Sequence, residues 1–326
     1  MAWRGIHVIK GEEAYDLVIL GAGPAGLTAG IYSSRLGLKT IVLESGIPGG
    51  RAGEAPFIEN YPGFPDGITG VELVEKMTKQ CSKFGAEIRT FEEAIDLELK
   101  GELKKVTTRK GSYISMAVII ATGTQRRKLR IPGESELLGR GVSYCPVCDG
   151  AFFKGLKVIV VGSGEEAASD ALFLTGLAGE VVLVTHGGPL EAADELLRRL
   201  RDKGVKVIEA RVTEIIGKDG VESVRVAYEE GREDVLPADG VFISLGGVPT
   251  SELVRKAGVE VDEKGCIKVD RWQKTSIEGV FAAGDCTCGG MQVITATGEG
   301  AMAAINASRY VKRKKRTGEG MKTKEY

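Results

Sequence analysis

Two cysteines separated by two residues, Cys145 and Cys148, are followed directly by Asp149 and a glycine. Cysteines with this spacing can close a disulfide, and at the start of a helix backbone amides lower the pKa of one thiol, whose thiolate then attacks other disulfides. Asp149 is a candidate acid/base, although aspartate before glycine is also a common turn residue. The motif therefore predicts a redox-active dithiol in which Cys145, Cys148 and Asp149 are the catalytic residues.

Two glycine-rich runs flank this dithiol, Gly-Ala-Gly-Pro-Ala-Gly at 21–26 and Gly-Ser-Gly-Glu-Glu-Ala at 162–167. Each follows a short apolar stretch and precedes a helix-compatible one, which is the context of a dinucleotide-binding fingerprint with the pyrophosphate on a helix N-terminus. The predicted contacts are Gly21, Gly23, Pro24, Ala25 and Gly26 in the first run, and Gly162, Gly164 and Ala167 in the second, more doubtful site. The order of motifs suggests that electrons pass from a nucleotide to a disulfide.

The first fingerprint carries the stronger nucleotide signal. An apolar run at 39–44 ends in Glu44, about 20 residues beyond the glycines, where a carboxylate accepts the ribose hydroxyls. In the second run, Glu165 and Glu166 occupy the turn where a pyrophosphate would approach, and they should repel it. The stretch 181–197 that follows contains neither arginine nor lysine.

Composition limits the classes of partner. The 326 residues suffice for two domains, and a balance of 44 basic and 45 acidic side chains gives no overall field that would attract nucleic acid or an anionic membrane. No run of about 18 apolar residues is present, and the N-terminus lacks the pattern of a secretory signal. We therefore expect a cytoplasmic protein that acts on small molecules or another protein, and we interpret the basic run 312–316 as a solvated end, with nucleic-acid binding as the alternative.

The remaining cysteines and histidines offer little further chemistry. Six cysteines are too few for a disulfide scaffold in a chain of this length. A zinc site would need four thiolates with an unfavourable spacing, and no metal site is predicted. We interpret Cys286 and Cys288 as structural, with thiols activated at a helix start as the alternative, whereas Cys81 and Cys266 show no chemical context. The two histidines are too few for triads, and His186 reads as a loop residue.

The chain predicts an α/β fold with two Rossmann-like nucleotide-binding domains of the three-layer ββα type, the second inserted into the first. Strands that end on glycine at 118–123, 241–249 and 279–285, followed by a small-residue helix, indicate that the C-terminal part completes the first domain. The predicted boundaries give a discontinuous FAD-binding domain at 1–124 and 246–326. The inserted domain at 125–245 carries the dithiol.

Five motifs in this order resemble the low-molecular-weight thioredoxin reductase family: residues 21–26, Glu-Asn-Tyr-Pro-Gly at 59–63, Ala-Thr-Gly at 121–123, the run 141–150 around the dithiol, and Ala-Gly-Asp at 283–285. The resemblance runs from about residue 15 to residue 310. It implies FAD on the first fingerprint and Glu44, and a homodimer. The flavin cleft would be lined by Gly50, Asn60, Thr122, Gly123, Asp285, Gln292 and Val293.

By the same resemblance, Cys148 faces the flavin, Cys145 attacks the substrate disulfide, and Asp149 serves as acid/base. The substrate would be a thioredoxin- or glutaredoxin-like protein, too large for the flavin cleft. A domain rotation about hinges at 123–125 and 245–248 would then alternate access to the dithiol. Two alternatives remain open: a small-molecule disulfide oxidoreductase on the same scaffold, and a flavin redox sensor without turnover.

The chain departs from the family pattern mainly at the electron donor. Arginines that select the 2′-phosphate of NADPH are absent from 181–197, so NADPH specificity loses its physical basis. The favoured donor is reduced deazaflavin F420, as in related archaeal enzymes, or another reduced flavin or ferredoxin, with NAD(P)H as the alternative. An archaeal, thermophilic source fits the low Asn and Gln content. Arg51 stands where glutamine is usual, and Met291 where arginine is usual.

Overall fold

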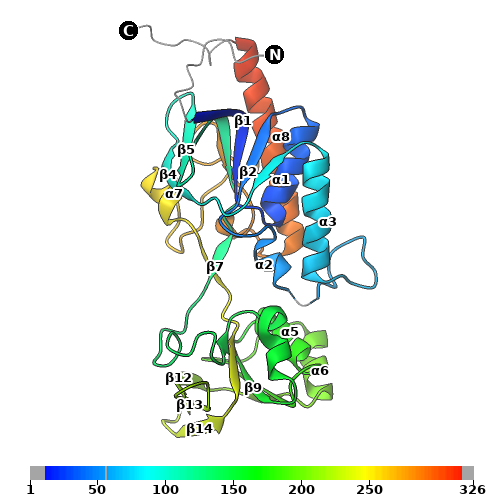
Figure 1. The fold of residues 1–326 in the computed structure, drawn as a ribbon, viewed down its shortest axis with the longest axis vertical. Helices are drawn as coiled ribbons and strands as arrows, with labels where there is room; N and C mark the ends of the chain where they lie inside the picture. The colour runs from blue at the N-terminus through cyan, green and yellow to red at the C-terminus, as the bar shows by residue number, and fades with distance from the viewer. Residues whose placement is uncertain (1–11, 56, 318–326) are drawn as a thin grey trace. The chain divides into compact units, whose positions relative to one another are not determined.

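The computed structural model describes residues 12–55 and 57–317, which form two compact units (Figure 1). The first unit contains the described residues up to Gly53, then Phe57–Thr124, and those from Pro249 onward. The second contains Gln125–Val248 with a short stretch from Glu54. The chain passes between the units through two paired segments, β7 (Thr124–Arg126) and β16 (Gly247–Pro249). The sequence placed these boundaries at 124/125 and 245/246.

The first unit is built on a seven-stranded sheet of order β3-β2-β1-β6-β5-β4, with β17 paired to β6. Its strands are β1 (Glu12–Leu20), β2 (Thr40–Leu43), β3 (Glu87–Arg89), β4 (Ala94–Glu98), β5 (Lys104–Thr108), β6 (Ser112–Ile120) and β17 (Val280–Ala282). β1 pairs in parallel with β2 and β6, while β4, β5 and β6 form an antiparallel meander. The central strands are near-continuous apolar runs because both of their faces are buried.

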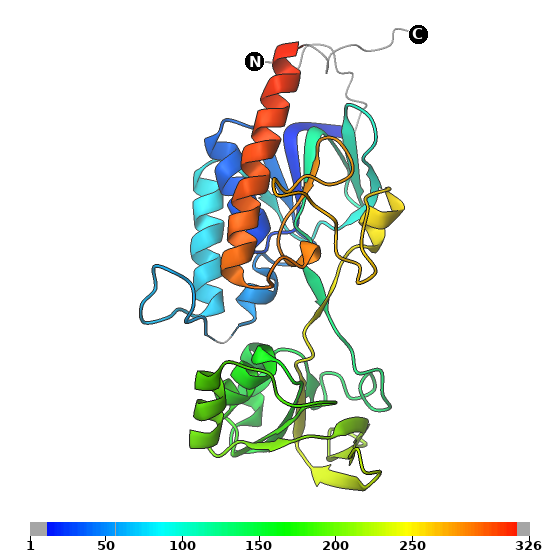
Figure 2. The same cartoon turned by 180° about the vertical axis from the view of Figure 1, so that it is seen from behind.

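Three helices lie side by side on one face of this sheet: α1 (Pro24–Arg35), α3 (Gly70–Lys83) and α8 (Val293–Thr317) (Figures 1 and 2). Shorter elements are α2 (Gly50–Gly53), α7 (Glu252–Lys256) and the 3-10 turn η2 (Asp285–Thr287). α1 begins at Pro24, within the first fingerprint, so its N-terminus lies beside the carboxyl ends of β1 and β6.

The second unit repeats the plan with a parallel sheet of order β11-β10-β9-β15-β8. Its strands are β8 (Val142–Ser143), β9 (Lys157–Val161), β10 (Glu180–Val184), β11 (Lys206–Ile208) and β15 (Gly240–Ile243). The remaining elements are α4 (Pro146–Asp149), η1 (Gly150–Phe153), α5 (Glu165–Leu174), α6 (Asp194–Asp202) and an antiparallel sheet of β12 (Arg211–Ile216), β13 (Ser223–Ala227) and β14 (Glu233–Pro237). The predicted α/β class with two Rossmann-like units is confirmed. Within the described ranges, no helix has the length and apolar character needed to cross a membrane.

Close contact between α1 and α8 fixes the first fingerprint. Gly300 of α8 is buried, and a Cβ there would lie 2.2 Å from the carbonyl oxygen of Ala25. One helix backbone thus rests directly on the other at the first turn of α1. Gly298, on the same helix, is exposed and has open space around its Cα. The two glycines therefore have different roles, although both lie in a helix.

We expect Gly300→Ala to lower the free energy of unfolding by about 1–3 kcal/mol, because the added methyl must push the two backbones apart. Gly298→Ala is the matched control and should raise stability by about 0.5–1 kcal/mol, since alanine is the better helix former. Urea denaturation followed by circular dichroism measures both. Changes of the same sign and size in the two variants would contradict the proposed packing role of Gly300.

Candidate active site

Cys145 and Cys148 form a disulfide whose Cα atoms are 5.3 Å apart. Cys145 is the N-cap residue of α4, and Pro146 supplies the pre-set first helical position. The backbone N–H of Cys148 donates to the Sγ atom of Cys145 over 3.2 Å. Once the disulfide is reduced, this donor stabilises negative charge on Cys145, which makes Cys145 the better thiolate of the pair.

Ser143 ties the dithiol to Asp149. Its hydroxyl donates to a carboxylate oxygen of Asp149 over 2.6 Å and accepts from the backbone N–H of Cys145 over 3.0 Å. Asp149 is thereby held beside the two cysteines, as the sequence motif requires. Cys148 is exposed and Cys145 is half-buried. Ser143 was not among the predicted site residues, and its only signal was a hydroxyl two residues before the first cysteine.

Tyr144 anchors the strand end that leads into the dithiol. Its hydroxyl donates to the carboxylate of Glu134, which is buried and also accepts from the backbone amides of Leu129 and Arg130 over 2.9 and 2.6 Å. Burial, reinforced by the bond to Glu134, raises the pKa of Tyr144 well above its ordinary value. The phenol therefore stays neutral and acts as a fixed tether for the residue before Cys145.

The first fingerprint fits the pyrophosphate of FAD. Gly21 has φ +99°, and a Cβ there would lie 2.3 Å from the carbonyl oxygen of Ala121. Gly23 is the N-cap of α1, has no neighbouring atom where its Cβ would be, and is followed by Pro24. No side chain caps this helix and its first turn contains no acid. Its backbone amides are thus presented to an anion of the cofactor.

Glu44 completes this half of the site. It follows β2, and its two carboxylate oxygens accept from the backbone amides of Ala22 and Gly46, each over 2.8 Å. The carboxylate is therefore fixed against the fingerprint loop, and its remaining lone pairs are suited to the ribose hydroxyls. Ala25 and Gly26 are buried in α1, where a Cβ on Gly26 would lie 1.8 Å from the carbonyl oxygen of Gly21.

The predicted flavin contacts come from three stretches of chain. The amide of Asn60 donates to the side-chain oxygen of Gln292 over 3.1 Å, although 232 positions separate them. Gly50, with φ +50°, begins α2 beside the Cα of Gly23. Val293 is the first residue of α8.

Thr122 and Gly123 follow β6 and are bound to the returning chain. The Thr122 hydroxyl donates to the carbonyl of Thr250 over 3.0 Å, and the amide of Thr250 donates to the carbonyl of Gly123 over 3.1 Å. Gly123 has φ +61°. This reciprocal pair of bonds fixes the strand end where the chain leaves the first unit and returns to it.

Asp285 begins η2, and two opposing effects act on the pKa of its carboxyl group. Burial raises its pKa, and the positive charge of Arg51 partly offsets that rise. Arg51 also donates to the hydroxyl of Thr124 over 3.3 Å. The half-buried carboxylate of Glu299 accepts from the amide of Gly284 over 2.7 Å and from the Thr287 hydroxyl over 3.1 Å, which holds the turn around Asp285.

The second fingerprint has the shape of a nucleotide site with different charges. A Cβ on Gly162 would lie 2.1 Å from the carbonyl oxygen of Ser244, Gly164 is the N-cap of α5, and Ala167 is buried. Its first helical turn contains Glu165 and Glu166, in contrast to α1. The loop after β10 returns to this site, where the amide of Glu191 donates to the carbonyl of Ser163 over 2.7 Å.

The cysteines outside the dithiol require one correction. Cys266, predicted to lack a chemical context, forms a disulfide with Cys288, with Cα atoms 5.6 Å apart. The two lie 22 positions apart and meet only through the tertiary fold, so sequence spacing gave no signal. Cys81 and Cys286 are free thiols, fully buried. No cluster of three or more potential metal ligands occurs in the part of the chain that the structure describes.

The fold and this site define a disulfide oxidoreductase built on two Rossmann-like units. Residues 15–300 match the model of the pyridine nucleotide-disulphide oxidoreductase family. The chain is 44% identical over 308 residues to the thioredoxin reductase of Listeria innocua, covering 92% of this chain and 95% of that protein. It therefore belongs to the thioredoxin reductase family and is an FAD-dependent enzyme.

Two solved structures extend the comparison. The thioredoxin reductase of Lactococcus lactis superposes with a TM-score of 0.88 at 38% identity, covering 92% of this chain and 99% of that one. A ferredoxin-flavin thioredoxin reductase from Clostridium acetobutylicum gives a TM-score of 0.52 at 35% identity, covering 93% and 99%. This relative is named for ferredoxin as well as for flavin and thioredoxin.

The two disulfides and the two buried thiols predict how many thiols react with a thiol reagent in the native and in the unfolded protein. Burial raises the pKa of both Cys81 and Cys286 to about 12, and both side chains are 0% exposed. We expect the oxidised, native protein to leave Ellman's reagent unreacted at pH 8, and the protein in guanidinium without reductant to release two thiol equivalents. Four equivalents would show that one of the two disulfides, Cys145–Cys148 or Cys266–Cys288, is open. Reduction of both disulfides before the titration should release six thiol equivalents, one for each cysteine, and this measurement is the control.

Proposed function

We propose that this enzyme passes electrons from a reduced donor through FAD to the Cys145–Cys148 disulfide, and from there to a thioredoxin- or glutaredoxin-like protein. The observation that carries the proposal is the dithiol itself: a disulfide at the start of α4, with one sulfur accepting a backbone N–H and a carboxylate held beside it by Ser143. The names of the relatives support a thioredoxin-like substrate. By resemblance, the enzyme would be a cytoplasmic homodimer.

FAD, when bound, would supply the two electrons that reduce the Cys145–Cys148 disulfide, leaving a thiolate on Cys145 and, after uptake of a proton, a thiol on Cys148. The thiolate of Cys145 then attacks one sulfur of the substrate disulfide, forming a mixed disulfide and releasing the other substrate sulfur, which takes up a proton. Cys148, deprotonated by Asp149, attacks the Sγ atom of Cys145. The intramolecular disulfide forms again, and the second substrate thiol leaves with the proton.

The dithiol must serve both a flavin and a large protein substrate, so we propose that the units change their relative orientation during turnover. Gly123 and Gly246 directly precede the crossing segments β7 and β16, and they have φ values of +61° and +78°. These positions suit hinges because glycine tolerates large changes in backbone angle.

Cys145→Ser and Cys148→Ser should each lower turnover with an oxidised thioredoxin by about 1,000-fold or more, because neither single thiol can complete the exchange. Reduction of the bound flavin should persist in both, since that step precedes thiol exchange. Anaerobic single-turnover absorbance separates the two steps. Cys81→Ala, which removes a buried thiol of α3, is the control and should retain turnover. Near-normal turnover by either serine variant would refute the assignment of the dithiol.

We further propose that the donor is not NADPH but reduced F420, another reduced flavin, or ferredoxin. Three features support this proposal: the acidic first turn of α5, the lack of arginine and lysine in 181–197, and the return of Glu191 to the fingerprint loop. A dinucleotide donor that places its pyrophosphate on the start of α5 would meet carboxylates where the FAD site offers bare amides. The Clostridium acetobutylicum relative, named for ferredoxin, adds independent support.

In anaerobic stopped-flow mixing we expect reduced F420, a reduced flavin or ferredoxin to reduce the bound FAD at least about 100-fold faster than NADPH at equal concentration. Glu165→Gln should increase the slow rate with NADPH several-fold by removing one repelling charge. Glu195→Gln, which neutralises an acid on α6, should leave that rate unchanged. Rapid, saturable reduction of the bound FAD by micromolar NADPH would contradict this proposal and show that the enzyme uses a pyridine nucleotide as its donor.

A further inference from the structure

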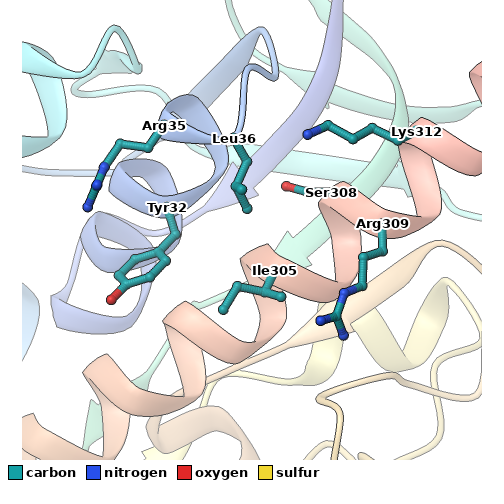
Figure 3. Close-up of a pocket in the computed structure, with 7 residues that line it drawn as sticks. All are labelled: Tyr32, Arg35, Leu36, Ile305, Ser308, Arg309 and Lys312. Atoms are coloured by element: carbon teal, nitrogen blue, oxygen red, sulfur yellow. The ribbon is translucent and has the colours of Figure 1, made fainter.

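A cavity of about 460 Å³ between α1 and α8 does not have the geometry of a ligand site (Figure 3). Figure 3 shows the guanidinium groups of Arg35 and Arg309 directed away from it. The Cζ atom of Arg35 lies 5.1 Å from the centre of the Phe84 ring, so this cation is already engaged. The chemistry that the mechanism leaves unused lies elsewhere in the first unit, at the Cys266–Cys288 disulfide.

The two sulfurs of this disulfide differ in their access to solvent. Cys266 is buried, whereas Cys288 is half-buried. A thiolate attacks the sulfur that it can reach, and the other sulfur becomes the leaving group. Cys288 is therefore the sulfur open to attack, and Cys266 is the thiol that would leave. Reduction of a protein disulfide yields a dithiol, so the proposed reaction itself generates a reductant for this bond.

The Cys266 end of the crosslink is fixed by hydrogen bonds of its own turn. One carboxylate oxygen of Asp262 accepts from the backbone amides of Lys264 and Cys266 over 2.9 and 2.8 Å. The amide of Ile267 then donates to the carbonyl of Cys286 over 2.8 Å, which places this stretch beside η2. Opening the disulfide would leave these bonds intact, so we expect the turn to keep its shape.

The Cys288 end, in contrast, begins a strained segment. Cys288 and Met291 both lie in the left-handed region, with φ values of +59° and +50°, and Gly290 between them has φ +145°. Residues with a side chain adopt such angles at a cost, and they keep them only where their surroundings hold them. This segment joins Asp285 to Gln292, two residues predicted to contact the flavin. The crosslink therefore holds one end of a strained connection between two proposed flavin contacts.

We infer that Cys266–Cys288 is a second thiol–disulfide exchange site, which the dithiol product of the enzyme opens and whose opening weakens the binding of FAD. This step rests on the function proposed above, which supplies the dithiol. Once the bond is broken, Cys288 and Met291 are free to relax toward ordinary backbone angles. Asp285 and Gln292 then shift relative to each other. Accumulated product thereby lowers the amount of enzyme that retains its cofactor.

The exchange conserves atoms and electrons. A thiolate of the reduced product attacks the Sγ atom of Cys288, a mixed disulfide forms, and Cys266 leaves as a thiolate that takes up a proton. The second thiol of the product loses its proton and attacks the product sulfur that is bound to Cys288. Cys288 then leaves and is protonated, so the product ends as a disulfide and the enzyme ends with two thiols. Oxidised product runs the same steps in reverse.

The exchange is tested on FAD-loaded enzyme that carries Cys145→Ser and Cys148→Ser. This variant retains Cys266–Cys288 as the only disulfide of the described residues. Incubation with an excess of a reduced bacterial thioredoxin, followed by acid quenching, unfolding and alkylation, should label Cys266 and Cys288 within about an hour. Peptide mass spectrometry detects the label, and the pair should stay closed in a sample without thioredoxin. A pair that stays closed in excess reduced thioredoxin would overturn the inference.

Because this variant lacks the catalytic dithiol, its result is separate from turnover by the unmodified enzyme, on which the proposed function depends. The effect on the cofactor is measured in the same variant as the Kd for FAD, by flavin fluorescence before and after treatment with thioredoxin. We expect opening to raise this Kd at least about fivefold, and excess oxidised thioredoxin to restore it. Cys81→Ala, added to this variant, removes a cysteine outside the crosslink and should leave the response unchanged.

A permanently open pair provides the matched comparison. Cys266→Ser with Cys288→Ser should show the raised Kd without treatment, and thioredoxin should change it no further. An open pair with an unchanged Kd for FAD would overturn the inference. So would a loss of FAD that reoxidation does not reverse, because it would indicate unfolding. The reversible opening of the native pair does not depend on how well the serine variant folds.

Discussion

The direct contact of backbones around the first fingerprint is the constraint on which the first unit depends. Gly21 approaches the carbonyl of Ala121, Gly26 approaches the carbonyl of Gly21, and Gly300 approaches the carbonyl of Ala25, each leaving no room for a side chain. Together these contacts fix the start of α1 against β1, β6 and α8. The amides at that helix end then converge on one point in space, beside the carboxylate of Glu44. The cofactor site is thus a consequence of packing rather than of a flexible loop.

The fingerprint of the second unit has the same close backbone contacts as that of the first, but its helix start carries negative charge. Gly162 meets the carbonyl of Ser244 just as Gly21 meets that of Ala121, so the fold of the fingerprint is retained. The first turn of α5, however, carries Glu165 and Glu166, whereas that of α1 carries no acid. Carboxylates at a helix N-terminus stabilise the helix by occupying the positive end of its dipole. The first turn of α5 therefore already carries negative charge at the position that a pyrophosphate would need.

The residues that could be predicted from the sequence are those whose interactions lie close together along the chain, and the residues that were missed depend on contacts between distant segments. The fingerprints, Glu44 and the dithiol are local patterns, in which a turn, a helix start or a strand end requires particular residue types at fixed spacing. Ser143 and the Cys266–Cys288 pair escaped prediction because each depends on a contact that only the folded chain creates. The flavin-side residues were reached through family resemblance, since nothing local links Asn60 to Gln292.

The unpredicted disulfide explains how the turn at Asp285 keeps its shape. That turn is a single three-residue 3-10 element followed by Cys288 in the left-handed region, with φ +59°, so regular secondary structure contributes little to its order. A crosslink that closes a loop of 22 residues restricts the unfolded chain by roughly 3 kcal/mol in the loop-entropy view. Cys266 is only 5% exposed, which shields its sulfur from thiolates in solution. Cys148, in contrast, is exposed. The Cys145–Cys148 disulfide, with one exposed cysteine, is thus the more accessible for electron exchange, whereas the Cys266–Cys288 disulfide, with one buried and one half-buried cysteine, holds the residues predicted to contact the flavin.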